Sequence, residues 1–294
     1  LTVSVSISAG VAQIVSAYPA LFPYRVVIAV IAVFFIMLIN LRGVKESGTA
    51  FAVPTYFFVV MMVGTVAFGV FRYFTGSLGM VIDPPHFEAK HILSAITPFI
   101  LLHAFANGTT ALTGVEAISN GITAFKEPRS KNAGITLIWM SLILGSLFLA
   151  LSFLTGKVQA VFSEEETVIS QLARTIYGGR GALYLMLISG TTVILIMAAN
   201  TAFADFPRLG ALHAGDGFLP RQLTYRGSRL VYSRGIVSLA VIASILIIIF
   251  QASVTRLIPL YAIGVFLSFT LSQAGMARRW WKIGHLAEGV EVVE

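Results

Sequence analysis

NGTTALTGVEAISNG, residues 107–121, places a carboxylate and a weakened helix in the middle of a long apolar run. That run covers residues 94–124, and as one continuous helix it would be about 46 Å long. A bilayer offers only roughly 30 Å of hydrocarbon, so the run predicts an interrupted or strongly tilted span. Gly and Asn weaken helix continuity, and threonine hydroxyls can satisfy the backbone groups that an interruption frees. The expected unwound backbone comprises Asn107, Gly108, Thr109, Thr110 and Gly114.

Glu116 is the acidic residue that lies deep within an apolar run. A charge at the bilayer centre costs about 2.5–3.5 kcal/mol on insertion scales, so such a residue normally faces a cavity or a partner. Non-helical backbone at membrane depth persists only where protein or water covers it, which in transporters is typically the binding site. We therefore expect Glu116 to be an ion ligand or a proton carrier. The alternative is a protonated Glu116 that makes one structural hydrogen bond between helices.

The composition predicts an all-α integral membrane protein. The 294 residues are 57% hydrophobic and 11% charged, with a mean hydropathy of +0.87. Neither the long polar faces of a soluble domain nor the alternating segments of a porin barrel are visible. The absence of cysteine excludes disulfides and cysteine metal sites. A transmembrane transport domain is expected over 1–276, followed by a cytoplasmic segment 277–294, with spans at 1–21, 26–40, 51–73, 94–124 (broken), 135–155, 181–203, 235–252 and 257–276.

The charges between these spans indicate topology. Alternate loops hold 13 of the 20 basic residues, and the positive-inside rule makes that side cytoplasmic, together with both visible chain ends. The basic balance is thus a topology signal, which argues against a nucleic-acid partner. No catalytic or nucleotide-binding motif is present, so we expect no enzyme and no cofactor. Because the chain begins at Leu1 inside an apolar run, we expect further spans upstream, and GHLAEGVEVVE resembles the start of a longer tail.

Two further groups of polar side chains lie in apolar spans. Thr2 and Ser6 are four residues apart, so their hydroxyls share one helix face. They are either ligands or hydroxyls bonded to the carbonyls of their own helix. Tyr261 follows Pro259 in the last span, where it is either a ligand or a tyrosine at the membrane interface.

Three motifs in order resemble the amino acid–polyamine–organocation (APC) superfamily of transporters. NLRGVKESG (40–48) resembles the entry to its fifth span, ALTGVEAISNGITAFKEPRSKNAGI (111–135) its broken sixth helix, and LHAGDGFLPRQL (212–223) the cytoplasmic loop after its eighth span. Within the superfamily, the sequence is most similar to the KimA-type bacterial potassium importers, which are often labelled amino acid permeases. The resemblance implies a LeuT-like five-plus-five inverted-repeat bundle. About eight of its spans, the third to the tenth, would be present, without the first two or most of any C-terminal domain.

The resemblance also implies a potassium site and its residues. Thr113 and Glu116 match the family's ligands in the broken helix, Thr2 and Ser6 match its hydroxyls in the third helix, and Tyr261 matches a tyrosine in the tenth. Neutral hydroxyl and carbonyl oxygens can replace the water shell of potassium. Burial disfavours an ionised carboxylate and an adjacent cation favours it, so occupancy by proton and by potassium would be coupled. The implied function is secondary active, proton-coupled potassium uptake by alternating access, with Glu116 as ligand and proton carrier.

Two other functions stay open at this stage. A proton-coupled amino acid permease on the same fold would bind a small amino acid, and a membrane scaffold would transport nothing. An expensive intramembrane acid argues against the scaffold. The resemblance further implies a multi-pass protein of the bacterial cell membrane, in contact with membrane lipid, that forms a homodimer and is subject to regulation by cyclic di-AMP.

Overall fold

The computed structural model describes residues 1–43, 48–85, 97–108, 118, 125–225, 227 and 232–291. In these ranges every regular element is a helix. The elements are α1 (Thr2–Ala17), η1 (Pro19–Tyr24), α2 (Arg25–Leu41), α3 (Gly48–Phe74), α4 (Pro98–Gly108), α6 (Arg129–Val158), α7 (Val168–Tyr177), α8 (Ala182–Gly215), η5 (Arg221–Thr224), α9 (Ser233–Ile249) and α10 (Val254–Glu291). They belong to two units. Unit 1 holds Leu1–Ser94 and Gly114–Leu257, and unit 2 holds Ala95–Thr113 and Ile258–Glu294.

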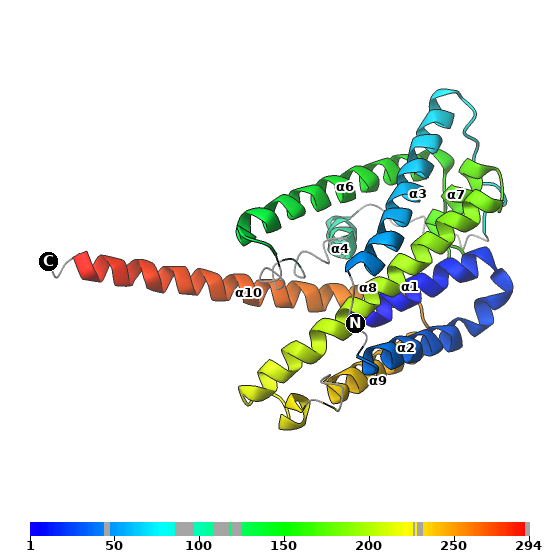
Figure 1. The fold of residues 1–294 in the computed structure, drawn as a ribbon. Helices are drawn as coiled ribbons and strands as arrows, with labels where there is room; N and C mark the ends of the chain where they lie inside the picture. The colour runs from blue at the N-terminus through cyan, green and yellow to red at the C-terminus, as the bar shows by residue number, and fades with distance from the viewer. Residues whose placement is uncertain are drawn as a thin grey trace. The chain divides into compact units, whose positions relative to one another are not determined.

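The centre of unit 1 is a bundle of α1, α2, α8 and α9 (Figure 1). Val3 of α1 and Ala199 of α8 lie in one buried apolar core, to which α2 and α9 also contribute. Farther along α1, the Tyr184 hydroxyl of α8 donates to the Ser16 carbonyl over 3.4 Å. Because residue numbers rise on one helix as they fall on the other, α1 and α8 run antiparallel. This contact holds both ends of α1 against one long helix.

A second layer of unit 1 packs α3, α6 and α7 together. Leu154 of α6 and Ile176 of α7 are fully buried in their shared core. Gly69 of α3 lies directly against them, since a Cβ there would be 2.7 Å from the Ile176 Cδ1 atom and 2.9 Å from the Leu154 Cδ1 atom. Only glycine permits this close approach of the α3 backbone without displacement of its neighbours.

The short helix α7 has clear local signals at both ends. The Thr167 hydroxyl accepts from the Ser170 backbone N–H over 3.2 Å, which satisfies one of the free donors of the first turn. Gly178 follows the last turn in the left-handed conformation, with φ at 73°. At the same end, Arg72 of α3 donates to the carbonyls of Thr175 and Ile176 over 3.1 and 2.6 Å. A cation at a helix C-terminus also complements the helix dipole.

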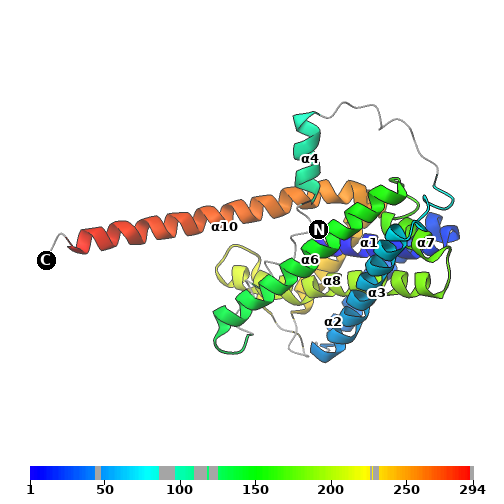
Figure 2. The ribbon, with the colours of Figure 1, turned by 90° about the horizontal axis from the view of Figure 1, so that it is seen from above.

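Unit 2 contains α4 and nearly all of α10. Figures 1 and 2 draw α10 as one continuous helix of 38 residues. Pro259 lies near its start, where a proline interrupts few intrahelical bonds. Helix α4 is 11 residues long and includes Asn107 and Gly108 as its last two residues.

Several helices expose apolar side chains over most of their length. Among the described residues, five helical segments are long and apolar enough to cross a membrane, and α1 and α9 are shorter apolar helices. In α6, Leu149 is 70% and Trp139 is 62% exposed. Such surfaces are normal against lipid and unfavourable in water. The described chain is therefore an all-α protein with the surface of a membrane protein.

The helices in the structure end at different residues from the apolar spans that the sequence predicts. Helix α1 ends at Ala17, because Pro19 and Pro23 turn the chain into the 3₁₀ segment that fills the rest of the expected range 1–21. Helices α8 and α10 continue well past residues 203 and 276, where the apolar ranges end. Hydropathy marks the portion of a helix that suits lipid, whereas the helix itself continues into polar sequence.

Candidate functional site

The hydroxyls of Thr2 and Ser6 lie on one face of α1 and are half-buried. Within the described part of the chain, neither side chain has a hydrogen-bond partner. Other hydroxyls in the protein do bond to a carbonyl of their own helix. The Ser16 hydroxyl donates to the Ala12 carbonyl over 2.7 Å, and the Thr191 hydroxyl donates to the Leu187 carbonyl over 2.8 Å. The Thr2 end of α1 thus presents two hydroxyl oxygens whose lone pairs are available to a ligand.

Ser4 shows what a structural hydroxyl on the same helix does. It is fully buried, and it donates to the Ala243 carbonyl of α9 over 3.2 Å. Ser4 lies two residues from both Thr2 and Ser6, on a different side of the helix. The packing of α1 against α9 therefore uses the face opposite to the candidate ligands.

Tyr261 is 6% exposed and lies in the second turn of α10. It belongs to unit 2, whereas Thr2 and Ser6 belong to unit 1. The prediction for Thr113, Glu116, Thr109, Thr110 and Gly114 lies outside the described residues. Of the residues expected to be unwound, the structure describes Asn107 and Gly108, and both are helical, as the last two residues of α4. Thr2 and Ser6 are therefore the predicted ligands that the structure brings together.

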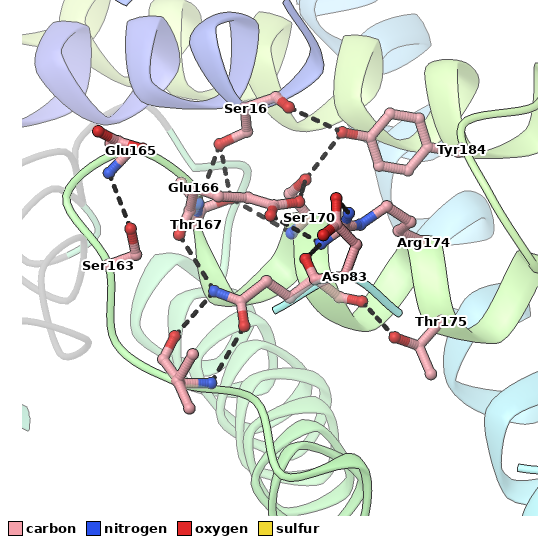
Figure 3. Close-up of polar contacts among 12 residues, drawn as sticks. Ser16, Asp83, Ser163, Glu165, Glu166, Thr167, Ser170, Arg174, Thr175 and Tyr184 are labelled. Atoms are coloured by element: carbon pink, nitrogen blue, oxygen red, sulfur yellow. Dashed lines mark hydrogen bonds and ion pairs between the residues drawn. The ribbon is translucent and has the colours of Figure 1, made fainter. Parts of the chain in front are cut away.

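The opposite end of α1 lies near a buried ion pair between Arg174 of α7 and Glu166, which comes just before that helix (Figure 3). Arg174 donates to Glu166 with 2.9 Å between Nη2 and Oε2, and the two side chains are 8% and 9% exposed. Arg174 also donates to the Asp83 carbonyl over 3.0 Å and lies 3.8 Å from the Asp83 carboxylate. Charges this deeply buried are stable only when paired and hydrogen-bonded, as these are.

Hydroxyls connect this ion pair to α1 and α8. The Ser170 hydroxyl lies 2.8 Å from the Glu166 Oε1 atom and 2.8 Å from the Tyr184 hydroxyl. Tyr184 in turn donates to the Ser16 carbonyl. Glu166, Ser170 and Tyr184 thus form a line of polar contacts that reaches α1, visible as dashed lines in Figure 3.

Thr167 provides a second connection between α7 and α1. Its backbone N–H donates to the Ser16 Oγ atom over 2.9 Å, and its hydroxyl donates to the Gln13 Oε1 atom over 3.1 Å. Ser16 and Gln13 are both buried. The cap residue of α7 is therefore also the residue that fastens α7 to α1, and we call the contacts of Gln13, Ser16, Glu166, Thr167, Ser170, Arg174 and Tyr184 the α7 network.

Sequence reasoning missed this network. The predicted spans at 135–155 and 181–203 leave Glu166 and Arg174 in the segment between them, where no site was expected. The local signals of α7 were nevertheless present, namely Thr167 as a cap and the pair Gly178-Gly179 as a stop. The partners on α1 lie 151 and 154 residues away in sequence, and no local pattern predicts them.

With this geometry in view, comparison with known proteins is informative. The family profile described as "Amino acid permease" matches residues 1–288. The chain belongs to the amino acid permease family. Its members are membrane transporters of the APC superfamily, so the all-α chain is a multi-pass membrane protein with the LeuT-like fold of that superfamily.

One curated protein that is similar to this chain is the "Potassium transporter KimA" of Bacillus subtilis (strain 168). The two sequences are 46% identical over 284 residues, which is 96% of this chain and 46% of the relative. The chain thus spans about half the length of the curated relative that it matches. The predicted resemblance to APC transporters and to KimA-type importers is confirmed.

Proposed function

We propose that this chain forms the transport region of a proton-coupled potassium importer that works by alternating access. The observation that carries the proposal is the 46% identity over nearly the whole chain to a protein named as a potassium transporter. The structural support is the pair of half-buried hydroxyls on α1 that have no partner in the described residues. A bare cation requires oxygen ligands of this kind in place of its water shell.

In this proposal potassium binds among Thr113, Glu116, Thr2, Ser6 and Tyr261. The four neutral side chains contribute hydroxyl oxygens, and Glu116 contributes a carboxylate. The antiparallel contact with α8 and the α7 network hold α1 in place, so the oxygens of Thr2 and Ser6 are presented by a rigid helix. Ligands on a rigid element lose little conformational entropy when an ion binds.

The proton acts at the same site in this proposal. A carboxylate away from water favours its protonated form, and an adjacent cation favours its ionised form. In this proposal Glu116 takes up its proton from the outside, and the ion bound beside it promotes release of that proton to the cytoplasm when the site opens there, so the proton and potassium enter together. Rocking of one repeat against the other opens the site to each side in turn.

The cellular setting follows from the same proposal. We place the protein in the bacterial cell membrane, with the loop side that holds most basic residues, and both ends of this chain, in the cytoplasm. By resemblance to the potassium importers we further propose a homodimer and regulation by cyclic di-AMP. No cofactor is required, since the ion and the proton are both substrates.

A proton-coupled amino acid permease is the second candidate. The description of the family profile favours it, because that profile is named for amino acid permeases and matches residues 1–288. A zwitterionic substrate needs backbone N–H groups for its carboxylate as well as oxygens for its ammonium group. The α1 face offers hydroxyls alone, which suits a cation better.

The test is uptake into proteoliposomes that contain the protein expressed from its complete gene. Rubidium serves as the potassium tracer under an inward proton gradient, and labelled amino acids are offered in parallel. We expect rubidium uptake that stops when a protonophore collapses the gradient, and no amino acid uptake. Amino acid uptake without rubidium uptake would contradict the proposal and favour the second candidate.

Two variants test which residues couple the movement of the proton to that of potassium. Glu116→Gln keeps the shape of the side chain but cannot ionise, and we expect it to abolish gradient-driven rubidium uptake. Thr113→Ala removes one oxygen, and we expect it to raise the rubidium concentration needed for half-maximal uptake by about tenfold, the effect of about 1.4 kcal/mol. Unchanged uptake in Glu116→Gln would argue for a structural role of this acid.

A further inference from the structure

The basic residues in the C-terminal part of α10 follow a stretch without charged residues whose length matches the thickness of a bilayer. Between Arg256 and Arg278 the helix contains no Asp, Glu, His, Lys or Arg, and this stretch of 257–277 is about 32 Å long at 1.5 Å per residue. The hydrocarbon core of a bilayer is about 30 Å thick. If α10 crosses the bilayer, Arg278, Arg279 and Lys282 therefore lie at the level of the lipid headgroups.

These three cations surround a shallow hollow on one face of α10. Gly275, Arg278, Arg279, Lys282 and Ile283 line it. The other four residues follow Gly275 by three, four, seven and eight positions, which is the spacing of a single helix face. Gly275 adds no side chain to this face, and a Cβ there would meet no atom within 4 Å, so the face is open at that residue.

The cations are not neutralised by the rest of the protein as described. All three are exposed, and none of the ion pairs found among the described residues includes them. Arg25, Arg129 and Arg174, by contrast, all have a carboxylate within 4 Å. A group of three positive charges around a hollow complements a compact anion such as a phosphate.

Two tryptophans occur at the same level of the helix. Trp280 and Trp281 are 65% and 70% exposed, and neither lines the hollow. Tryptophan is enriched at the boundary between hydrocarbon and headgroups, where its ring is in apolar surroundings and its N–H reaches polar groups. Their presence beside the cations independently places this turn of α10 at the headgroup level.

We propose that the hollow around Gly275 binds the phosphate of an anionic phospholipid. Arg278, Arg279 and Lys282 contact the headgroup, and Gly275 lets it approach the helix. In the proposed orientation this lipid belongs to the cytoplasmic leaflet. The inference concerns a lipid site on α10 and does not depend on the identity of the transported substrate.

Native mass spectrometry of the detergent-purified protein, expressed from its complete gene, tests this site. The protein is titrated with dioctanoyl phosphatidylglycerol and, separately, with dioctanoyl phosphatidylcholine. We expect phosphatidylglycerol to bind at least tenfold more tightly, because each basic residue near a membrane surface contributes about a fivefold preference for anionic lipid. Equal binding of the two lipids would overturn the proposal.

Matched variants separate this site from general basic charge. The triple variant Arg278→Gln, Arg279→Gln, Lys282→Gln should bind phosphatidylglycerol on the order of a hundredfold more weakly. The control Arg208→Gln, Arg221→Gln, Arg234→Gln removes the same charge from exposed residues elsewhere and should leave binding unchanged. An equal loss in both triple variants would show non-specific attraction and overturn the site.

A third variant tests the shape of the site at constant charge. Gly275→Leu fills the hollow and has space to do so, so we expect a folded protein that binds phosphatidylglycerol about tenfold more weakly, the effect of about 1.4 kcal/mol. Wild-type affinity in Gly275→Leu would contradict a role for the hollow. Displacement of the lipid by millimolar inorganic phosphate would assign the site to a free anion and overturn the lipid proposal.

Discussion

The two ends of α1 differ in how their polar side chains are used. At the Ser16 end, Gln13 and Ser16 are buried and hydrogen-bonded to Thr167 of α7. At the Thr2 end, two half-buried hydroxyls have no hydrogen-bond partner among the described residues. The Ser16 end therefore uses these polar side chains for protein contacts, whereas the Thr2 end, which Ser4 also fastens to α9, presents two oxygens to a ligand as well. A transport site needs both, because precise ligand positions require a fixed helix.

The largest expected loss of stability follows from removing one charge of the buried ion pair near the Ser16 end of α1. Arg174→Met leaves Glu166 buried without its partner, and loss of one partner of a buried pair typically costs about 3–5 kcal/mol. We expect a large drop in the unfolding temperature of the detergent-purified protein. Arg180→Met changes an exposed arginine six residues away and should have little effect. Similar stability of the two variants would show that the ion pair does not fix α7.

A smaller effect is expected from the helix that supports α7. Gly69→Val places side-chain atoms where Ile176 and Leu154 already lie, and overpacking of this kind costs about 1–3 kcal/mol. Gly64→Val is the matched control on the same helix, since a Cβ there meets no atom within 4 Å. Thermal unfolding of both variants measures the difference. If Gly64→Val is destabilised as much, the effect reflects helix propensity and not the contact with α7.

The comparison between the ends of α1 is sharpest for Ser6 and Ser16. Ser16→Ala removes the acceptor of the Thr167 N–H, which is worth about 1 kcal/mol of folding stability. Ser6→Ala removes a hydroxyl that has no partner within the described chain, so its stability should change by less than about 0.5 kcal/mol. Chemical or thermal denaturation of the two variants in potassium-free buffer provides the measurement. A larger loss in Ser6→Ala would remove the distinction between the two ends.

The smallest expected effect concerns a contact near the Thr2 end. Asn40 of α2 donates to the Asn200 amide of α8 over 2.6 Å. Hydrogen bonds between membrane helices contribute about 0.6 kcal/mol on average, so Asn40→Ala should lower stability by that amount. Thr201→Ala, which removes a bond within its own helix, is the control. A loss several times larger would show that the Thr2 end is also held by a polar network.

Apolar runs in the sequence predict helices well in the parts of the chain that contact lipid, because lipid contact favours apolar side chains. The helix α9 occupies Ser233–Ile249, so both of its ends lie within three residues of the apolar run at 235–252. The apolar run at 181–203 covers only the first two thirds of α8, because a helix that leaves the membrane can continue with polar residues. Hydropathy therefore predicts the presence of a span more reliably than the ends of its helix.

The site was predictable to the extent that its residues are chemically unusual for their surroundings. Hydroxyls four apart in an apolar helix indicate a shared face, and the structure describes that face for Thr2 and Ser6. The α7 network could not be predicted, because Glu166 and Arg174 resemble ordinary loop charges until α1, α7 and α8 are folded together. Burial is what distinguishes such a pair, and burial is a property of the tertiary structure.

The most direct test of this account is a potassium titration of thermal stability. A ligand that binds only the folded state stabilises it by RT ln(1 + [L]/Kd), so the ligand concentration needed for a given rise in unfolding temperature reports affinity. With sodium replaced by potassium at constant ionic strength, we predict that Ser6→Ala and Thr2→Val need about tenfold more potassium than the wild type for the same rise, corresponding to about 1.4 kcal/mol. Ser16→Ala should start at a lower unfolding temperature yet need the same potassium concentration as the wild type for that rise. A wild-type potassium requirement in Ser6→Ala and Thr2→Val, or equal stabilisation by sodium and potassium, would contradict the account.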